Sequence, residues 1–290
     1  MNQFNAKLLL ALVFAARGTS FLFSKHLLES MSPMSILAFR FIMAFLILCL
    51  IFFKKIRQAG KESVLGGLAL GGLYTLCMVF EMYGLQYVDT GVSALIENMA
   101  ILFVPFWVSI VMRRLPKFKT LLCAFLAVIG VGLLSVSQMS KDSGTFGLIL
   151  IISAAVTYGF CIIGTEKVTR NADPVAIGVF QLGTMGIASL LLSFITGTFE
   201  CPSTQNQWVM LLILVLLCSC FGFTFQPVGQ KYVAAESAAV LTVINPLTAS
   251  LMGIIAAGES LTPSKLAGYG VILSALVIYN SRLFERHIKI

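Results

Sequence analysis

The sequence predicts an all-α integral membrane protein with ten transmembrane helices, arranged as two inverted five-helix repeats. Three observations support this fold class. Of the 290 residues, 58% are hydrophobic and only 11% are charged, whereas a soluble domain carries about 25% charged residues. The apolar residues form separate runs of membrane-spanning length, and basic residues cluster on alternate sides of these runs. Finally, the two halves of the chain resemble each other.

Each apolar run is long enough to cross a bilayer core of about 30 Å at about 1.5 Å per residue. The first run contains Arg17, and we interpret it as a retained span rather than a signal peptide because its apolar pattern continues past Arg17. These runs occupy nearly the whole chain, which leaves no room for a soluble catalytic domain. The ten predicted helices are residues 6–28, 34–53, 63–86, 91–112, 118–138, 144–168, 174–197, 206–231, 235–257 and 262–282.

The distribution of basic residues predicts the orientation. Lys25, Lys141 and Lys265 lie on one side of the ten-span path, and Arg17 and Arg40 lie within spans. By the positive-inside rule, the basic side is cytoplasmic and holds both termini. We therefore expect a multi-pass protein of the cell membrane, in contact with lipid, and no nucleic-acid partner despite the net charge of +8. The residues of the basic side are Lys7, Lys54, Lys55, Arg57, Lys61, Arg113, Arg114, Lys117, Lys119, Lys167, Arg170, Lys231, Arg282, Arg286 and Lys289.

An internal repeat divides the chain into residues 1–140 and 141–290. A unit of five spans has its ends on opposite sides of the membrane, so the second copy is inverted relative to the first. Inverted repeats are typical of secondary transporters, which bind their solutes between the two copies. The matches pair Arg17-Gly18 with Tyr158-Gly159, Pro33 with Pro174, and EMYGLQYV (81–88) with QPVGQKYV (226–233), at offsets of 141 and 145 residues.

Several segments resemble the EamA-type ten-span carriers of the drug/metabolite transporter superfamily. The resemblance implies transport of small metabolites across the cytoplasmic membrane without ATP, and hence no cofactor. One departure stands out: Arg17 occupies the position before Gly18 where the family usually has Trp. The matching segments are Gly18 with the following Lys25, PMSILAFRFIMAFLIL (33–48), residues 87–114, and residues 245–278 with Pro246, Gly258-Glu259 and Gly268.

Charges inside the spans identify the candidate binding site. Arg17, Arg40, Glu81 and Glu97 sum to zero, as expected of a network that lines a shared cavity. An alternative is that they form fixed ion pairs that hold the first four spans together, which is at least as plausible for Arg40. The full set of candidate substrate-binding residues is Arg17, Tyr158, Arg40, Glu81, Glu97, Gln181 and Trp107.

In the second half, neutral residues replace this charged set. The counterparts of Arg17, Arg40, Glu81 and Glu97 are Tyr158, Gln181, Gln226 and Thr242. One guanidinium, two carboxylates and neutral hydrogen-bonding groups suit a small polar or zwitterionic solute whose carboxylate binds Arg17.

Two prolines lie inside predicted spans. Pro105 falls in the fourth span and Pro246 in the ninth. A proline within a helix removes a hydrogen bond and frees a carbonyl, so we expect kinks there that assist gating or serve packing.

These features favour a secondary carrier of small polar metabolites, amino-acid-like and exported. Protons are candidate coupling ions and a homodimer is a candidate assembly. Efflux of lipophilic cations is a second transport hypothesis, which the two arginines argue against. An intramembrane enzyme would require a nucleophile with a base, or a metal site; neither histidine suits either one, and no HExxH or GxSxG motif occurs. We therefore expect no catalytic residues and no metal. A receptor or scaffold would not readily explain a buried neutral charge cluster.

Overall fold

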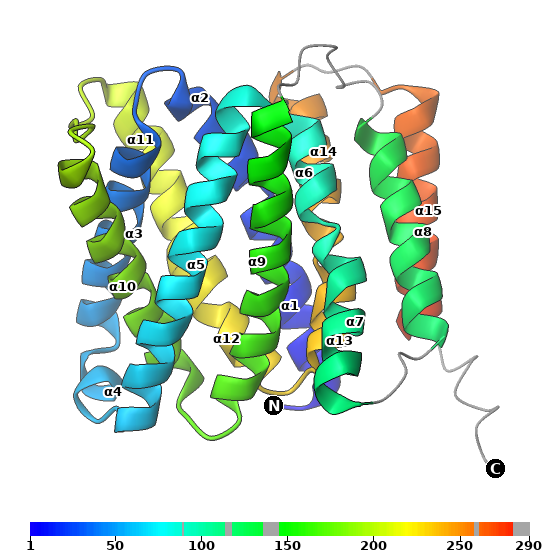
Figure 1. The fold of residues 1–290 in the computed structure, drawn as a ribbon, viewed down its shortest axis with the longest axis horizontal. Helices are drawn as coiled ribbons and strands as arrows, with labels where there is room; N and C mark the ends of the chain where they lie inside the picture. Colours follow the sequence, from blue (N-terminus) through cyan, green and yellow to red (C-terminus); the bar gives the residue numbers. More distant parts are fainter. Residues whose placement is uncertain (89, 114–117, 136–144, 258–260, 281–290) are drawn as a thin grey trace.

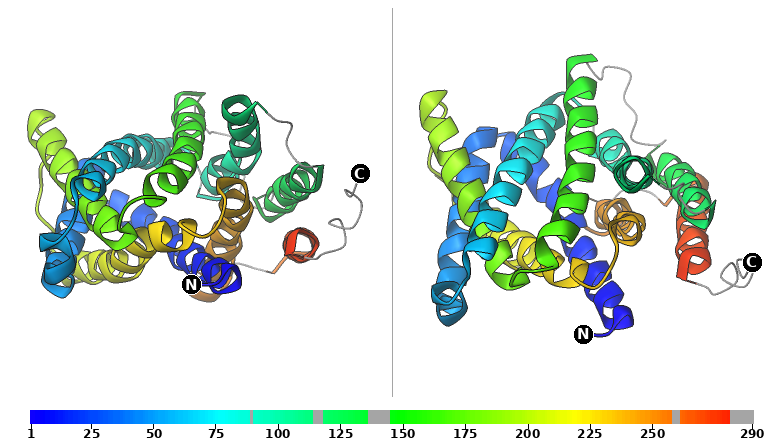
Figure 2. Two further views of the ribbon diagram at one scale, coloured as in Figure 1. Left: turned by 90° about the horizontal axis from the view of Figure 1, so that it is seen from below. Right: turned by 60° about the horizontal axis from the view of Figure 1, so that its bottom comes forward.

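The computed structural model describes residues 1–88, 90–113, 118–135, 145–257 and 261–280. These residues form a bundle of helices without strands, and most of the helices run between the top and the bottom of Figure 1. Two further views show the helices arranged around the bundle axis, with α8 and α15 at one edge (Figure 2).

In the first half, two predicted spans consist of two helical pieces each. The first span is α1 followed by α2, and the fourth is α6 followed by α7. A short exposed helix, α4, carries the basic sequence FKKIR at the bottom of the bundle (Figure 1). The bounds are α1 (Gln3–Gly18), α2 (Ser20–Leu28), α3 (Pro33–Ile51), α4 (Phe53–Arg57), α5 (Lys61–Tyr87), α6 (Thr90–Glu97), α7 (Ala100–Met112) and α8 (Phe118–Ser135).

The second half differs in its first span, which is the single helix α9. Its third span contains a π-helix, η2, between two α-helical ends, and its fourth span is again divided in two. The bounds are α9 (Thr145–Thr169), α10 (Pro174–Ile195), α11 (Gln205–Ile213), η2 (Leu214–Phe223), α12 (Thr224–Gln230), α13 (Ala235–Leu241), α14 (Ile244–Ala257) and α15 (Pro263–Asn280).

Among the described residues, seven stretches are long and apolar enough to cross a membrane, which supports the predicted membrane protein. The prediction of ten spans goes beyond this number, although two shorter apolar helices lie at residues 118–130 and 263–278. The seven stretches are Gln3–Leu28, Pro33–Ile51, Lys61–Tyr87, Thr145–Thr169, Pro174–Ile195, Gln205–Gln230 and Ala235–Met252.

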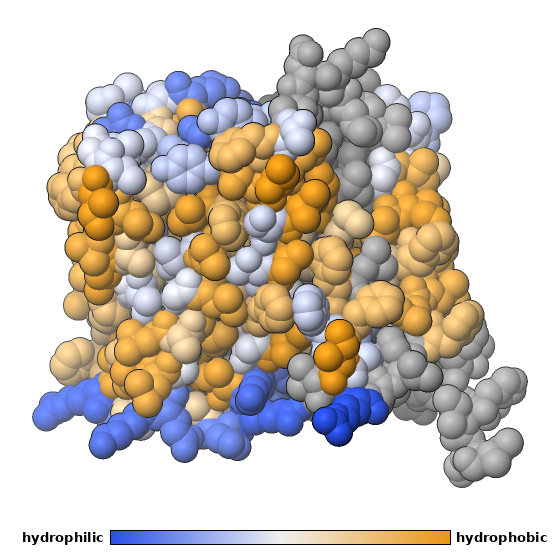
Figure 3. Space-filling view, in the orientation of Figure 1, coloured by the Kyte–Doolittle hydropathy of each residue, from blue (hydrophilic) through white to orange (hydrophobic). Residues whose placement is uncertain are grey.

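The surface has the character expected of a protein surrounded by lipid. Apolar side chains form a broad belt across the face shown in Figure 3, and hydrophilic side chains gather below it. Lys54, Lys55 and Arg57 of α4 are exposed at that lower face, on the same side as the start of α1 (Figure 1).

Four helices form the best-packed part of the bundle. α5 packs against α9 on one side and α10 on the other, and α10 also packs against α3 (Figure 1). The start of α10 is well defined by its sequence: Pro174 is the first helical residue, and the Asp173 side chain accepts hydrogen bonds from the N–H groups of Val175 and Ala176. α8 and α15 pack against each other and share a second apolar cluster with α7 and α13.

The interruptions of the fourth and ninth spans lie away from the prolines that we expected to cause them. The fourth span is interrupted at Asn98–Met99, before α7, and Pro105 lies inside α7. The ninth is interrupted at Thr242–Val243, and Pro246 is the third residue of α14. A proline in the first helical turn leaves no hydrogen bond of the helix unmade. Pro246 therefore fits its helix.

Candidate functional site

The four charged residues predicted within spans line one cavity in the middle of the bundle. Arg17, Arg40, Glu81 and Glu97 are each between 3% and 6% exposed, and all four contribute to its wall. Ser20, Phe223 and Asn245 are among the other lining residues. The cavity measures about 10 Å³, which holds about one water molecule. The structure thus brings the charges together but leaves no space for a solute.

Arg17 lies in the last turn of α1 and contacts the second half of the chain. Its Nη1 donates hydrogen bonds to the Tyr158 hydroxyl at 3.2 Å and to Gln226 Oε1 at 2.5 Å. The guanidinium carbon also lies 4.3 Å from the Phe223 ring centre and 5.2 Å from that of Tyr158. Cation–π contacts of this kind stabilise a desolvated cation. The Arg17 guanidinium is therefore held by aromatic faces and neutral acceptors.

Gln226 is oriented by a chain of hydrogen bonds. Its Nε2 donates to the Tyr74 hydroxyl at 2.8 Å and to Gln230 Oε1 at 3.2 Å. Gln230 Nε2 in turn donates to the carbonyl of Ile162 at 3.4 Å. Because the Gln226 amide nitrogen is used in this way, its oxygen faces Arg17.

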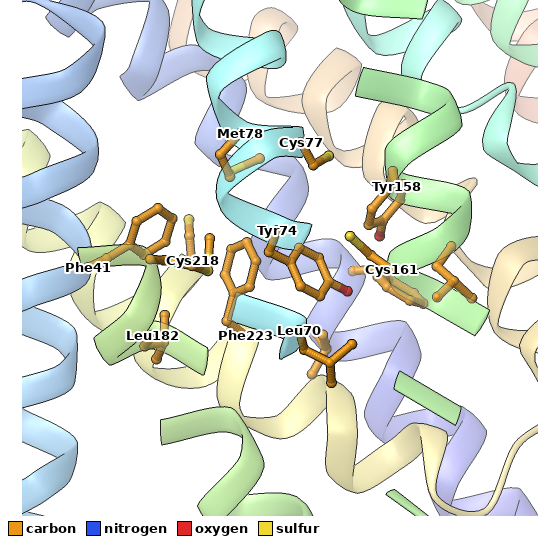
Figure 4. Close-up of a cluster of buried hydrophobic side chains, with 14 of the residues drawn as sticks. Phe41, Leu70, Tyr74, Cys77, Met78, Tyr158, Cys161, Leu182, Cys218 and Phe223 are labelled. Carbon is orange, nitrogen blue, oxygen red and sulfur yellow. The ribbon is translucent and has the colours of Figure 1, made fainter. Parts of the chain in front are cut away.

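A row of aromatic rings forms the wall beside Arg17. Phe41, Phe223, Tyr74 and Tyr158 follow one another across the bundle (Figure 4). Successive ring centres are 5.5, 5.4 and 6.4 Å apart, and each pair is edge-to-face. This geometry is the favourable one for aromatic pairs. The row joins helices of both halves into a rigid support for the guanidinium.

Arg40 has a different partner, and neither arginine pairs with a glutamate. Arg40 Nε donates to the Ser219 hydroxyl at 2.8 Å. Among the four charged residues, no arginine nitrogen lies within 4.0 Å of a glutamate oxygen, since the ion pairs between described residues lie elsewhere. Glu97 Oε2 is fully buried and has no hydrogen-bond partner among the described residues. The structure therefore does not show the fixed ion pairs considered as an alternative.

The π-helix η2 supplies two of the groups that contact the arginines, Ser219 and Phe223. A π-helix within an α-helical span is a common feature of functional sites. Gly222, in the same helix, allows close approach: a Cβ atom at this position would lie 2.8 Å from Arg17 Cγ. Thus η2 fixes the position of Arg17 through contacts that require a residue without a side chain.

Two predicted site residues lie elsewhere. Gln181 is buried on α10 but does not line the cavity, and its Oε1 has no partner among the described residues. Trp107 on α7 packs against Phe160, with ring centres 4.8 Å apart, and is also absent from the lining. Five residues of the arrangement were not among the predicted candidates: Ser219, Phe223, Gln226, Tyr74 and Asn245. Of these five, only Gln226 could have been found from the sequence, because it occupies the position in the second half that corresponds to Glu81.

Hydrogen bonds join helices toward both ends of the bundle. Toward the top of Figure 1, Lys25 Nζ donates to the carbonyl of Leu85 at 2.6 Å, near the end of α5. Toward the bottom, Glu166 Oε2 accepts a hydrogen bond from the Ala235 N–H at 2.7 Å, at the start of α13. The two contacts join helices on opposite sides of the membrane-spanning part of the bundle.

Comparison with known proteins identifies the family. The sequence profile of the EamA-like transporter family matches residues 5–136 and 145–281. The chain belongs to the EamA-like transporter family. It is therefore a multi-pass membrane transporter of small-molecule solutes and not an enzyme.

Relatives of this EamA-like chain are named as transporters. An uncharacterized transporter of Archaeoglobus fulgidus is 28% identical over 224 residues, covering 77% of this chain and 78% of that protein. The S-adenosylmethionine/S-adenosylhomocysteine transporter of Chlamydia muridarum is 26% identical, covering 93% and 90%. The biotin transporter of Escherichia coli K12 is 22% identical, covering 80% and 78%. A solved crystal structure shares the fold, with a TM-score of 0.77, 10% identity and 95% coverage of both chains.

Proposed function

We propose that this protein is a secondary active transporter of a small, amino-acid-like metabolite, exported across the cell membrane by alternating access. The observation that carries the proposal is the placement of Arg17. Its guanidinium lies in the central cavity, and both of its hydrogen bonds use Nη1. The edge formed by Nε and Nη2 makes no hydrogen bond to another described residue. Two parallel donors on that edge match the geometry of a carboxylate.

The architecture proposed for this activity is two inverted repeats, residues 1–140 and 141–290, with ten spans. The two family matches, at residues 5–136 and 145–281, support this division. The interruption of the fourth span of each half, at Asn98–Met99 and Thr242–Val243, also supports it. Basic side chains on the face that holds the start of α1 support a cytoplasmic N-terminus.

The closed cavity supports alternating access. A space of about 10 Å³ admits no metabolite, so a solute enters only when one end of the bundle opens. We propose that the contact of Lys25 with Leu85 and that of Glu166 with Ala235 close the two ends. Opening one end while keeping the other closed exposes Arg17 to one side at a time. Glu81 and Glu97 are the proposed carriers of a coupling proton.

The names of the relatives support the size of the solute. One relative is named for biotin and another for S-adenosylmethionine and S-adenosylhomocysteine, which are small organic molecules. Efflux of a lipophilic cation is less favoured, because Arg17 and Arg40 line the same cavity and would repel a cation.

The test is transport by purified protein in proteoliposomes. Counterflow is measured for labelled amino acids, dicarboxylates, sugar phosphates, amines and tetraphenylphosphonium, with and without a pH gradient. We expect ATP-independent exchange of a carboxylate-bearing solute. Arg17→Gln reduces its affinity at least tenfold, since a charge-assisted hydrogen bond contributes about 1.5–3 kcal/mol. Arg57→Gln, an exposed arginine of α4, is the matched control and leaves the affinity unchanged.

Two results would contradict the proposal. Exchange of tetraphenylphosphonium in place of carboxylates would favour cation efflux. Equal affinities for a carboxylate solute in wild-type and Arg17→Gln protein would exclude Arg17 from the binding site.

A further inference from the structure

We infer that Glu97 and Asn245 form a subsite for a cationic N–H donor, the primary ammonium group of the transported solute. This inference rests on the proposed transport function, and it assigns a role to Asn245, which no sequence pattern singled out. Glu97 is the last residue of α6 and Asn245 the second residue of α14. The two interrupted spans therefore present these side chains to the same cavity, one from each half of the chain.

Both side chains line the cavity, and each holds a buried hydrogen-bond acceptor that receives no donor. Each residue is 5% exposed, and Glu97 Oε2 and Asn245 Oδ1 are buried oxygens with no partner among the described residues. When Glu97 is ionised, its Oε2 and Asn245 Oδ1 are both acceptors and cannot bond to each other. Buried polar groups in folded proteins are nearly always paired. We infer that a bound solute supplies the hydrogen-bond donor for these two oxygens.

Neither arginine donates a hydrogen bond to these two oxygens in the structure. Arg17 Nη1 is used by Tyr158 and Gln226, and Arg40 Nε by Ser219. Neither arginine lies within 4.0 Å of Glu97, since the ion pairs between described residues join other side chains. The guanidinium of Arg17 faces the Phe223 ring at 4.3 Å. The cavity thus has a cationic part beside Phe223 and an anionic part beside α6 and α14.

Separated charges of this kind match a zwitterion. A carboxylate at Arg17 and an ammonium group at Glu97 would each meet the opposite charge within one cavity. An ammonium group carries three donors, so it can satisfy Glu97 Oε2, Asn245 Oδ1 and the hydroxyl of Ser20, which also lines the cavity. A bare metal cation is disfavoured, because hard cations take six to eight oxygen ligands and two arginines share the site.

The specificity is tested by comparing ligands that differ in one group. Affinities are measured by ligand-induced thermal stabilisation of the full chain in detergent, for the twenty amino acids. Each amino acid that binds is compared with the acid that lacks its amino group and the amine that lacks its carboxyl group. Wild-type protein should bind the amino acid at least tenfold more tightly than either analogue.

Variants separate the two ends of the ligand. Asn245→Leu and Glu97→Gln should abolish the preference for the amino acid over its deaminated analogue, while the analogue binds as it does to wild type. Arg17→Gln should lose both ligands. The matched control is Asn98→Leu, which removes the buried asparagine at the interruption of the fourth span; Asn98 donates to the Ala94 carbonyl at 2.8 Å and does not line the cavity. It should retain the preference.

Four outcomes would contradict the subsite. In wild-type protein, these are binding of no amino acid, or equal affinity for the amino acid and its deaminated analogue. In the variants, they are an unchanged preference for the amino acid in both Asn245→Leu and Glu97→Gln, or a loss of that preference in Asn98→Leu as well. The second of these, with the analogue still lost in Arg17→Gln, would leave the proposed carboxylate transport intact. Failure of every solute to exchange in proteoliposomes would instead contradict the proposed function itself.

Discussion

Replacing Gly222 by alanine should displace Arg17 without altering its charge. A Cβ atom at this position would lie 2.8 Å from Arg17 Cγ, and ordinary contacts begin at 3.4 Å. The side chain must therefore move by about 0.6 Å, or the helices must separate by that amount. A movement of this size away from Tyr158 would stretch the 3.2 Å hydrogen bond to about 3.8 Å, beyond the range of a hydrogen bond.

The expected effect on folding is smaller than the effect on binding. Loss of a hydrogen bond to a charged group removes about 1.5–3 kcal/mol, and replacing glycine by alanine within a helix returns about 1 kcal/mol. The free energy of unfolding should therefore fall by about 0.5–2 kcal/mol. The affinity for a carboxylate ligand should fall at least tenfold, because the guanidinium no longer presents its donors in the same place.

The assay is a thermal-shift titration of purified Gly222→Ala protein with the carboxylate ligand found in the transport screen. The matched control is Gly72→Ala on α5, where a Cβ atom would have no heavy atom within 4 Å; it should bind as wild type and melt no earlier. Wild-type affinity in Gly222→Ala, together with an unchanged melting temperature, would refute the view that η2 fixes the position of Arg17.

Three further substitutions test the contacts around the cavity. Tyr158→Phe keeps the ring beside Arg17 and removes the hydroxyl, so carboxylate affinity should fall about tenfold; wild-type affinity would show that this hydrogen bond does not position the guanidinium. Ser219→Ala removes the acceptor for Arg40 Nε and should lower the free energy of unfolding, measured by thermal melting, by about 1.5–3 kcal/mol, whereas an unchanged melt would count against a structural role for Arg40. Asn245→Leu deletes an unpartnered buried oxygen and should raise the melting temperature of ligand-free protein, because such a group costs about 1–3 kcal/mol; a lower melting temperature would mean that the amide is already satisfied.

The charged part of the site could be predicted from the sequence because charges are rare and costly within apolar spans. Arg17, Arg40, Glu81 and Glu97 stand out against their neighbours, and all four line the cavity. Tyr158 was found only through the repeat, as the counterpart of Arg17, and it does contact that residue. The same reasoning placed Gln181 in the site, where it does not lie, because a shared position in two repeats does not ensure a shared cavity.

The neutral part of the site could not be predicted. Phe223 is one of 23 phenylalanines, and its selection depends on the helix rotation that turns it toward Arg17. Asn245 lies in an apolar run beside Pro246, which was expected to disturb the helix; the helix instead begins there, after an interruption at Thr242–Val243. The apolar pattern predicted where the spans lie but not where they are interrupted, since both helical pieces of a span are equally apolar.

The π-helix also accounts for a mismatch in length between the proposed repeats. α5 begins at Lys61 and α11 at Gln205, 144 residues later, yet Gly84 and its counterpart Gly229 are 145 residues apart. The stretch from the start of the span to the matched glycine is therefore one residue longer in the second half, and the wider turns of η2 accommodate this residue. Deleting one residue from Leu214–Phe223 would rotate the two ends of this span relative to each other by about 100°. Gln226 would then face away from Arg17, so the site depends on the number of residues in this helix as well as on their identity.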